Sequence, residues 1–147
     1  MTSTCLLASR RTDLEACCCA TSPVSDSIVA VGTYTQRDPA TRDGLLLYHD
    51  AAQPGLPEIG RLATPGIFDL RWAPTSSLLA LACSNGATLL CSGLGELVAS
   101  SAPDDAMCTS VDWRSRDSLA CCGQDGRAHT LALREVREHT APQARSS

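Results

Sequence analysis

Three histidines are the side chains of this 147-residue sequence best suited to act as a general base near neutral pH. His49 and His129 lie within stretches that we expect to be strands, whereas His139 lies near the C-terminal end. Nucleophilic catalysis also needs an activated nucleophile beside the base, and no G-x-S-x-G motif supplies one here. His49 and His129 are therefore candidates for a catalytic base, but partly exposed structural histidines are the favoured interpretation of both.

The nine cysteines show no arrangement typical of a metal or redox site. The clusters Cys17-Cys18-Cys19 and Cys121-Cys122 contain no C-x-x-C spacing and no histidine at the distance of a zinc ligand. Cys83, like Cys121 and Cys122, lies in an apolar run, where a free cysteine packs as a small hydrophobic side chain. We therefore expect buried free thiols, no metal and no cofactor.

The charge balance disfavours nucleic acid as a partner. The formal net charge is −4, and the twelve basic residues are all arginines that are scattered along the chain. The longest apolar run, Leu78 to Cys83, is too short to span a bilayer, and the N-terminal residues lack the order of charges of a secretory signal. A cytoplasmic protein without membrane association is the expectation.

Two segments of the sequence repeat one pattern, and their tryptophans, Trp72 and Trp113, stand 41 residues apart. In each copy a short strand ends at the tryptophan, and a polar turn, a nearly unbroken apolar strand, a tight turn and a third strand follow. We expect the tight turns, Asn85-Gly86 and Asp125-Gly126, to be two-residue hairpins with positive φ angles. Residues Gly95 to Ser100 are expected to form a fourth, outer strand.

A third and more divergent copy precedes these two. Leu14-Glu15-Ala16 takes the place of the first strand, with Ala16 at the tryptophan position, and Ile28 to Val31 is the apolar second strand. A polar insertion, Thr35 to Asp43, replaces the tight turn before the strand Gly44 to Tyr48. Arg37 and Arg42 of this insertion are candidates to meet an acidic partner, although a solvated loop is the favoured interpretation.

A period near forty residues with four strands per unit predicts an all-β fold, a partial WD-repeat β-propeller of about three blades. A β-sandwich is the alternative. Three blades are too few to close a ring, so we expect the N-terminal part of a longer protein or a shortened product. The expected boundaries are an N-terminal segment at 1–11, a first blade at 12–62 with the insertion 35–43, a second blade at 63–101, an incomplete third blade at 102–139 and a disordered tail at 140–147.

Glu15, Arg71 and Asp112 each precede the tryptophan position of their copy by one residue. Because side chains alternate along a strand, all three should point away from the tryptophan side. If the first strands line a central channel, these charges would lie on its wall. A series of ion pairs between blades is favoured over a ring that contacts substrate.

Two segments also carry a resemblance to a known family. The strand that ends in Gly32-Thr33-Tyr34 is followed by the insertion, by Gly44-Leu45-Leu46-Leu47-Tyr48 and then by Thr64 to Trp72. This order is similar to the N-terminal blade of the diphthine methylesterase family, which are divergent WD-repeat proteins of diphthamide biosynthesis. The resemblance covers about Thr12 to Leu133, and its most specific pieces are Gly32-Thr33-Tyr34 and Ile67 to Trp72.

The resemblance implies a carboxylic ester hydrolase whose protein substrate is translation elongation factor two. Such an enzyme hydrolyses the methyl ester of methylated diphthine, an intermediate built on a histidine, so that amidation can follow. The resemblance assigns no catalytic residue to this sequence. A non-catalytic WD-repeat scaffold that binds other proteins and a truncated inactive product stay open as alternatives.

Overall fold

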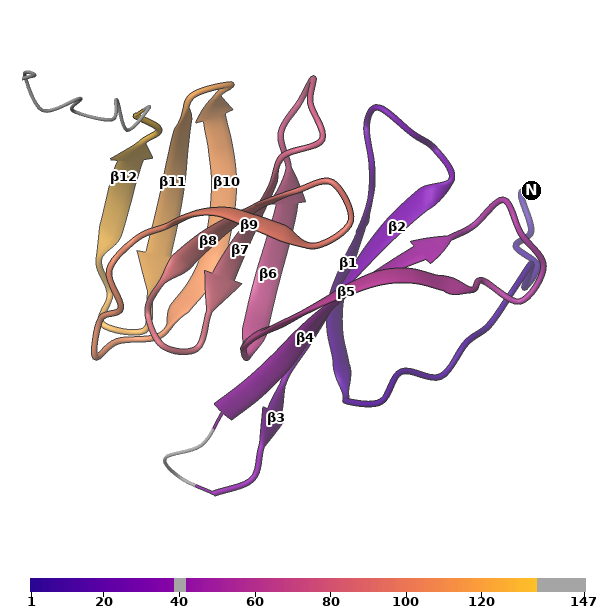
Figure 1. Cartoon of the computed structure of the whole chain (residues 1–147), viewed down its shortest axis with the longest axis horizontal. Helices are drawn as coiled ribbons and strands as arrows, with labels where there is room; N and C mark the ends of the chain where they lie inside the picture. Colours follow the sequence, from indigo (N-terminus) through magenta and orange to yellow (C-terminus); the bar gives the residue numbers. More distant parts are fainter. Residues whose placement is uncertain (39–41, 135–147) are drawn as a thin grey trace, which may run out of the picture.

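The computed structural model describes residues 1–38 and 42–134. Within these ranges the chain forms twelve β-strands and no helix, so the all-β expectation is confirmed. The strands make three antiparallel sheets that follow one another along the molecule (Figure 1), and none of the three closes on itself. Consequently, the described ranges contain no helix able to cross a membrane. His139, the predicted tail 140–147 and the middle of the insertion lie outside the described residues.

The first sheet comprises five strands. They are β1 (Ala16–Thr21), β2 (Ile28–Thr33), β3 (Thr35–Gln36), β4 (Arg42–Asp50) and β5 (Glu58–Pro65). β4 pairs with β2 on one side and β5 on the other, and the short β3 pairs with the beginning of β4. The two ends of the insertion Thr35–Asp43 therefore pair as a hairpin that extends the sheet, with Thr35 opposite Asp43.

The second and third sheets repeat one strand order. The second is β6 (Ile67–Trp72), β7 (Leu79–Cys83), β8 (Thr88–Ser92) and β9 (Glu96–Ser100), and the third is β10 (Cys108–Ser115), β11 (Ser118–Gly123) and β12 (Ala128–Ala132). These strands lie where the repeat predicts them. The expected boundary between residues 62 and 63 is wrong, because β5 continues through it to Pro65.

The core lies between the sheets. β6 contacts both β1 and β10, so the first strand of the second sheet lies between the first strands of its neighbours. β7 is buried along its whole length, because Leu79 and Leu81 pack toward the first sheet and Ala80 and Ala82 pack toward the third. A strand covered on both faces carries an unbroken apolar run, which is the pattern that the sequence shows.

Trp72 and Trp113 make the same hydrogen bond in successive sheets. Nε1 of Trp72 donates to the carbonyl oxygen of Ala20 on β1 at 3.1 Å, and Nε1 of Trp113 donates to the carbonyl oxygen of Arg71 on β6 at 2.9 Å. Ala20 opposes Ala30 and Arg71 opposes Ala80, so the two acceptors occupy equivalent positions. Each tryptophan thus joins its own inner strand to that of the preceding sheet.

Small residues on the second strand of each sheet let the next sheet approach closely. Gly32 on β2 corresponds to Ala82 on β7, and a Cβ atom on Gly32 would lie 2.7 Å from Cγ2 of Ile67 in the second sheet. Such a distance is shorter than any ordinary contact, so only glycine fits without displacement of its neighbours. Large side chains of one sheet therefore pack against small side chains of the one before it.

The two tight turns differ from the expectation. Gly86 and Gly126 have φ angles of 82° and 78°, but neither Asn85 nor Asp125 has a positive φ. Gly86 N donates to Cys83 O, and Cys83 N donates to the carbonyl oxygen of Ala87, which defines a three-residue loop that ends in a left-handed glycine. The side chains of Asn85 and Asp125 instead accept hydrogen bonds from the backbone two residues later.

The expected alignment of the first sheet is wrong by five residues. Thr21 opposes Val29 just as Trp72 opposes Leu79, so Thr21 and not Ala16 occupies the tryptophan position. The residue before it is Ala20 and not Glu15. β1 consists of two alanines, three cysteines and a threonine, so it lacks the large side chains that mark the other inner strands, and this difference concealed the register.

Replacing Trp72 with phenylalanine tests the hydrogen bond between the first two sheets. We expect the free energy of unfolding to fall by about 1–3 kcal/mol, because Ala20 O loses its donor and the core gains a void. Trp113→Phe should cost less, since its hydrogen bond is exposed. Urea unfolding followed by the fluorescence of the remaining tryptophan measures both. Equal costs would contradict this ranking.

Candidate functional site

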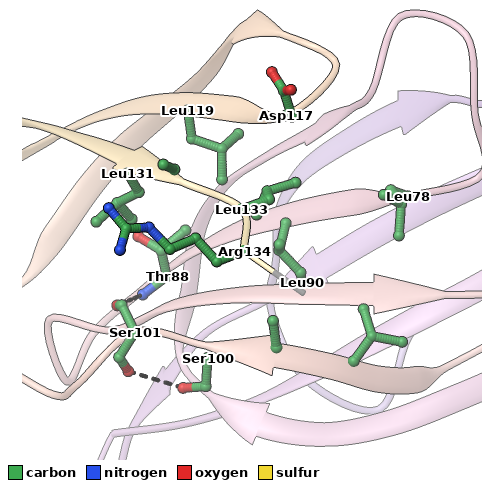
Figure 2. A pocket seen from close by; sticks show the side chains of 13 residues that line it. Leu78, Thr88, Leu90, Ser100, Ser101, Asp117, Leu119, Leu131, Leu133 and Arg134 are labelled. Carbon is green, nitrogen blue, oxygen red and sulfur yellow. Dashed lines mark hydrogen bonds between the residues drawn. The ribbon is translucent and has the colours of Figure 1, made fainter. Parts of the chain in front are cut away.

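A cleft of about 880 Å³ opens between the second and third sheets (Figure 2). Its lining is mostly apolar, with Leu90 from β8, Leu119 from β11 and Leu131 from β12. The second sheet has a fourth strand, β9, but in the described residues β12 pairs only with β11. Among residues 1–38 and 42–134 no strand fills the space beside β12, and the cleft occupies it.

Polar groups lie at the rim of the cleft and are largely engaged by the backbone. The hydroxyl of Ser101 accepts a hydrogen bond from Thr88 N at 2.8 Å, and the hydroxyl of Ser100 donates to Ser101 O at 2.9 Å (Figure 2). Asp117 and Arg134 contribute one charge of each sign from the third-sheet side. An apolar floor with few polar groups suits binding of a peptide or another partly apolar ligand.

Cys121 and His129 lie on the same face of the third sheet as the cleft floor. They are direct partners across β11 and β12, where opposed Cβ atoms are about 4.5–5.5 Å apart, so the thiol and the imidazole are within reach of each other. Both also line a small cavity of about 40 Å³. His129 is exposed and makes no hydrogen bond or ion pair with the other described residues, so its ring can turn toward the thiol.

The pair lies beside the cleft and not in its lining, and the Cys121 thiol also interacts with that of the buried Cys108. A thiol beside an imidazole can lose its proton to the ring and act as a nucleophile. His129 is a candidate base that the sequence predicts, but Cys121 is not, since a partner across two strands is visible only once the register is known. No group of three or more histidine, cysteine or acidic residues within residues 1–38 and 42–134 is placed to hold a metal.

Burial keeps several other cysteines protonated. It raises the pKa of Cys18 and Cys83 from 9.0 to about 12, and that of Cys91 and Cys108 from 9.0 to about 11. These thiols pack as small hydrophobic side chains and are unreactive near neutral pH. Cys122 was expected to be buried, but it is exposed because the alternation of β11 turns it away from the second sheet.

His49 is not placed for catalysis. Its side chain is only 3% exposed, which is less than the partial exposure expected from the sequence. Nδ1 lies 3.1 Å from the carbonyl oxygen of Leu56, in the turn that leads into β5, whereas Nε2 has no hydrogen-bond partner among the described residues. The ring is enclosed by the first sheet and that turn, so a protein substrate cannot reach it.

Glu15, Arg71 and Asp112 do not form the predicted series of neighbouring charges. Glu15 precedes β1, and its backbone carbonyl accepts a hydrogen bond from Tyr34 N. Arg71 pairs with Asp69 of its own strand, with Nε 3.7 Å from Oδ1. The Asp112 carboxylate accepts from the next backbone N–H, that of Trp113. The register does place Arg71 and Asp112 at equivalent positions, but Glu15 lies outside the series.

Asp69 is the charge that connects the inner strands, and the sequence did not predict this role. Its Oδ2 accepts hydrogen bonds from the hydroxyl of Ser110 at 3.0 Å and from Val111 N at 3.1 Å, both on β10. Its negative charge also helps to raise the pKa of Cys18 on β1, after the larger effect of burial. The only signal in the sequence was one carboxylate inside an apolar strand, Ile67 to Trp72.

The arginines of the insertion are engaged within the chain. Nε of Arg37 lies 3.5 Å from Oδ2 of Asp43, and both side chains are largely exposed. Arg42 contacts the sulfur of Met107 near the start of β10. Arg37 is therefore the more accessible of the two candidates for an acidic partner.

No protein-family model matches the sequence, and a search of curated proteins finds no match.

The buried thiols predict that stability falls in alkaline solution. An unfolded chain releases these protons as the pH rises through about 9, whereas the folded chain keeps them until about pH 11–12. The unfolded state then binds fewer protons, so the free energy of unfolding decreases above pH 9. Urea unfolding between pH 7 and pH 10.5 measures the decrease, and Cys83→Ala should make it shallower. A constant stability across this range would contradict burial of the thiols.

Proposed function

We propose that this chain is a partial WD-type β-propeller of the diphthine methylesterase kind and that it hydrolyses the methyl ester of methylated diphthine on translation elongation factor two. In this proposal the three sheets are blades, and the protein acts in the cytoplasm without a cofactor. Three blades are fewer than the four to eight that usually close a ring.

The contact between the two most specific pieces of the resemblance carries the proposal. The Cα hydrogen of Gly32 faces Ile67, and the rings of Tyr34 and Phe68 have centroids 4.9 Å apart. Thr33, which stands between Gly32 and Tyr34 in the sequence, is fully buried. The two pieces are about thirty residues apart but pack as one unit, which supports reading them as a single family signature and not as two chance similarities.

The unit has a structural role, so the chemistry must come from elsewhere. We assign it to Cys121 and His129. The thiol sulfur attacks the ester carbonyl carbon while its proton passes to the imidazole, and methoxide leaves as methanol with that proton. Water, deprotonated by the imidazole, then hydrolyses the thioester, which yields the free carboxylate and restores the thiol. The neighbouring cleft would hold the protein segment around the modified histidine.

A non-catalytic WD-repeat scaffold is the second candidate function. The apolar floor of the cleft and the unpaired edge of β12 within the described residues favour it, because an extended peptide binds by adding a strand to such an edge. In this case Cys121 would only pack between the second and third sheets, and His129 would be an ordinary surface residue of a binding protein.

Incubation of the purified chain with elongation factor that carries methylated diphthine distinguishes the two. We expect release of methanol, and a decrease in the mass of the modified peptide that corresponds to loss of one methyl ester. Cys121→Ala and His129→Ala should each reduce the rate at least about 100-fold.

Cys122→Ala is the matched control, since it removes the adjacent thiol from the opposite face of β11, and it should keep full activity. Absence of methanol release by the unmodified chain at high concentration would remove the enzyme proposal and leave the scaffold. Full activity of Cys121→Ala would retain the function but refute the assigned nucleophile.

A further inference from the structure

The outward face of the third sheet resembles the face of the second sheet on which the third sheet packs. It is the side of β10, β11 and β12 that points away from the second sheet, and its residues are exposed or half-buried. By register they correspond to the face that the second sheet presents to the third. The outward residues are Ser110, Asp112, Ala120, Cys122, Ala128 and Thr130, and they match Asp69, Arg71, Ala80, Ala82, Thr88 and Leu90.

Two features make that correspondence specific. Ala120 and Cys122 are small, as are Ala80 and Ala82, which lie against the third sheet in the second core. The carbonyl of Asp112 occupies the position at which Arg71 O and Ala20 O accept the indole N–H of the following sheet. The face thus repeats the shape and the acceptor of two interfaces that the chain already contains.

The outward face of the first sheet is the counterpart. Its inner half carries Cys19, Thr21, Val29 and Val31, all exposed or half-buried. These residues correspond to Val111, Trp113, Leu119 and Cys121, the side chains with which the third sheet packs on the second. Two positions of β1 carry smaller residues than their equivalents, because Thr21 stands at the tryptophan position and Cys19 stands where β6 and β10 have Leu70 and Val111.

The residues before β1 leave this inner half free. Asp13 pairs with Arg61 on β5, with Oδ2 3.1 Å from Nη2, and Arg61 opposes Leu47, whose side chain is 1% exposed. Asp13 therefore reaches the outer strand β5 of this face, whereas Cys19 and Thr21 of β1 are exposed. In the packing of the third sheet on the second, β10 contacts β6 and β7, which are inner strands.

We propose that two copies of this chain associate through these faces, with the third sheet of each packed against the first sheet of the other. The association continues the stacking already present within the chain, and it is independent of the proposed ester hydrolysis. A twofold axis makes both contacts identical and yields six sheets, a number within the range of closed propellers. The two end faces formed by the described residues are then both covered.

The molar mass of the full-length chain in solution tests the proposal. Sedimentation equilibrium in the presence of a reducing agent, which excludes intermolecular disulfides, should give twice the mass of one chain in the micromolar range. A single-chain mass at all concentrations up to the millimolar range would overturn the proposal. The outward faces of the first and third sheets would then be available to a further sheet or another protein.

Thr21→Trp supplies the missing indole at an exposed position, and it should lower the dimer dissociation constant about tenfold, because each of the two contacts gains a donor for Asp112 O. Ala120→Arg places a long charged side chain on the receiving face and should raise the constant at least about tenfold. Thr75→Arg, in the exposed turn between β6 and β7, is the control for added charge and should leave it unchanged. A dimer that is insensitive to both Thr21→Trp and Ala120→Arg would form through another surface, and this result would also refute the proposal.

Discussion

The need to cover both faces of an antiparallel sheet is the constraint on which the rest of this structure depends. β7 has no polar face, so the second sheet is stable only with a sheet on each side. The solution is a stack in which large side chains of one sheet pack on small side chains of the preceding one, with a tryptophan indole joined to the preceding inner strand. The repeated spacing in the sequence results from this arrangement, because each sheet needs the same residue types at equivalent positions.

The candidate site follows from the same stack. Where the third sheet has three described strands against four in the second, the two cannot cover each other fully, and an apolar cleft is left beside β12. Cys121 and His129 sit on that face because the register of β11 and β12 brings them opposite each other. The site is thus positioned by strand pairing and sheet packing, and not by a dedicated loop.

The parts of the site differ in how far the sequence could predict them. His129 was recognisable as a base by residue type, but Cys121 had the same apolar surroundings as the buried Cys83, and its pairing with His129 depends on the register of β11 against β12. The sequence shows Asp69 as a single charge within a strand, and only the tertiary structure reveals its hydrogen bonds to β10. His49 was placed on the correct strand, but its burial depends on a turn whose path the sequence did not reveal.

The sequence by itself determined the all-β class, the two well-formed repeats and the positions of their turns, because alternation, apolar runs and left-handed glycines act over a few residues. The register of the first sheet, the contacts between inner strands and the pairing of Cys121 with His129 were decided only in the tertiary structure. A shift of a strand along its neighbour changes every facing pair while it leaves the local pattern intact. Packing against the next sheet selects one register, and that information lies in residues distant along the chain.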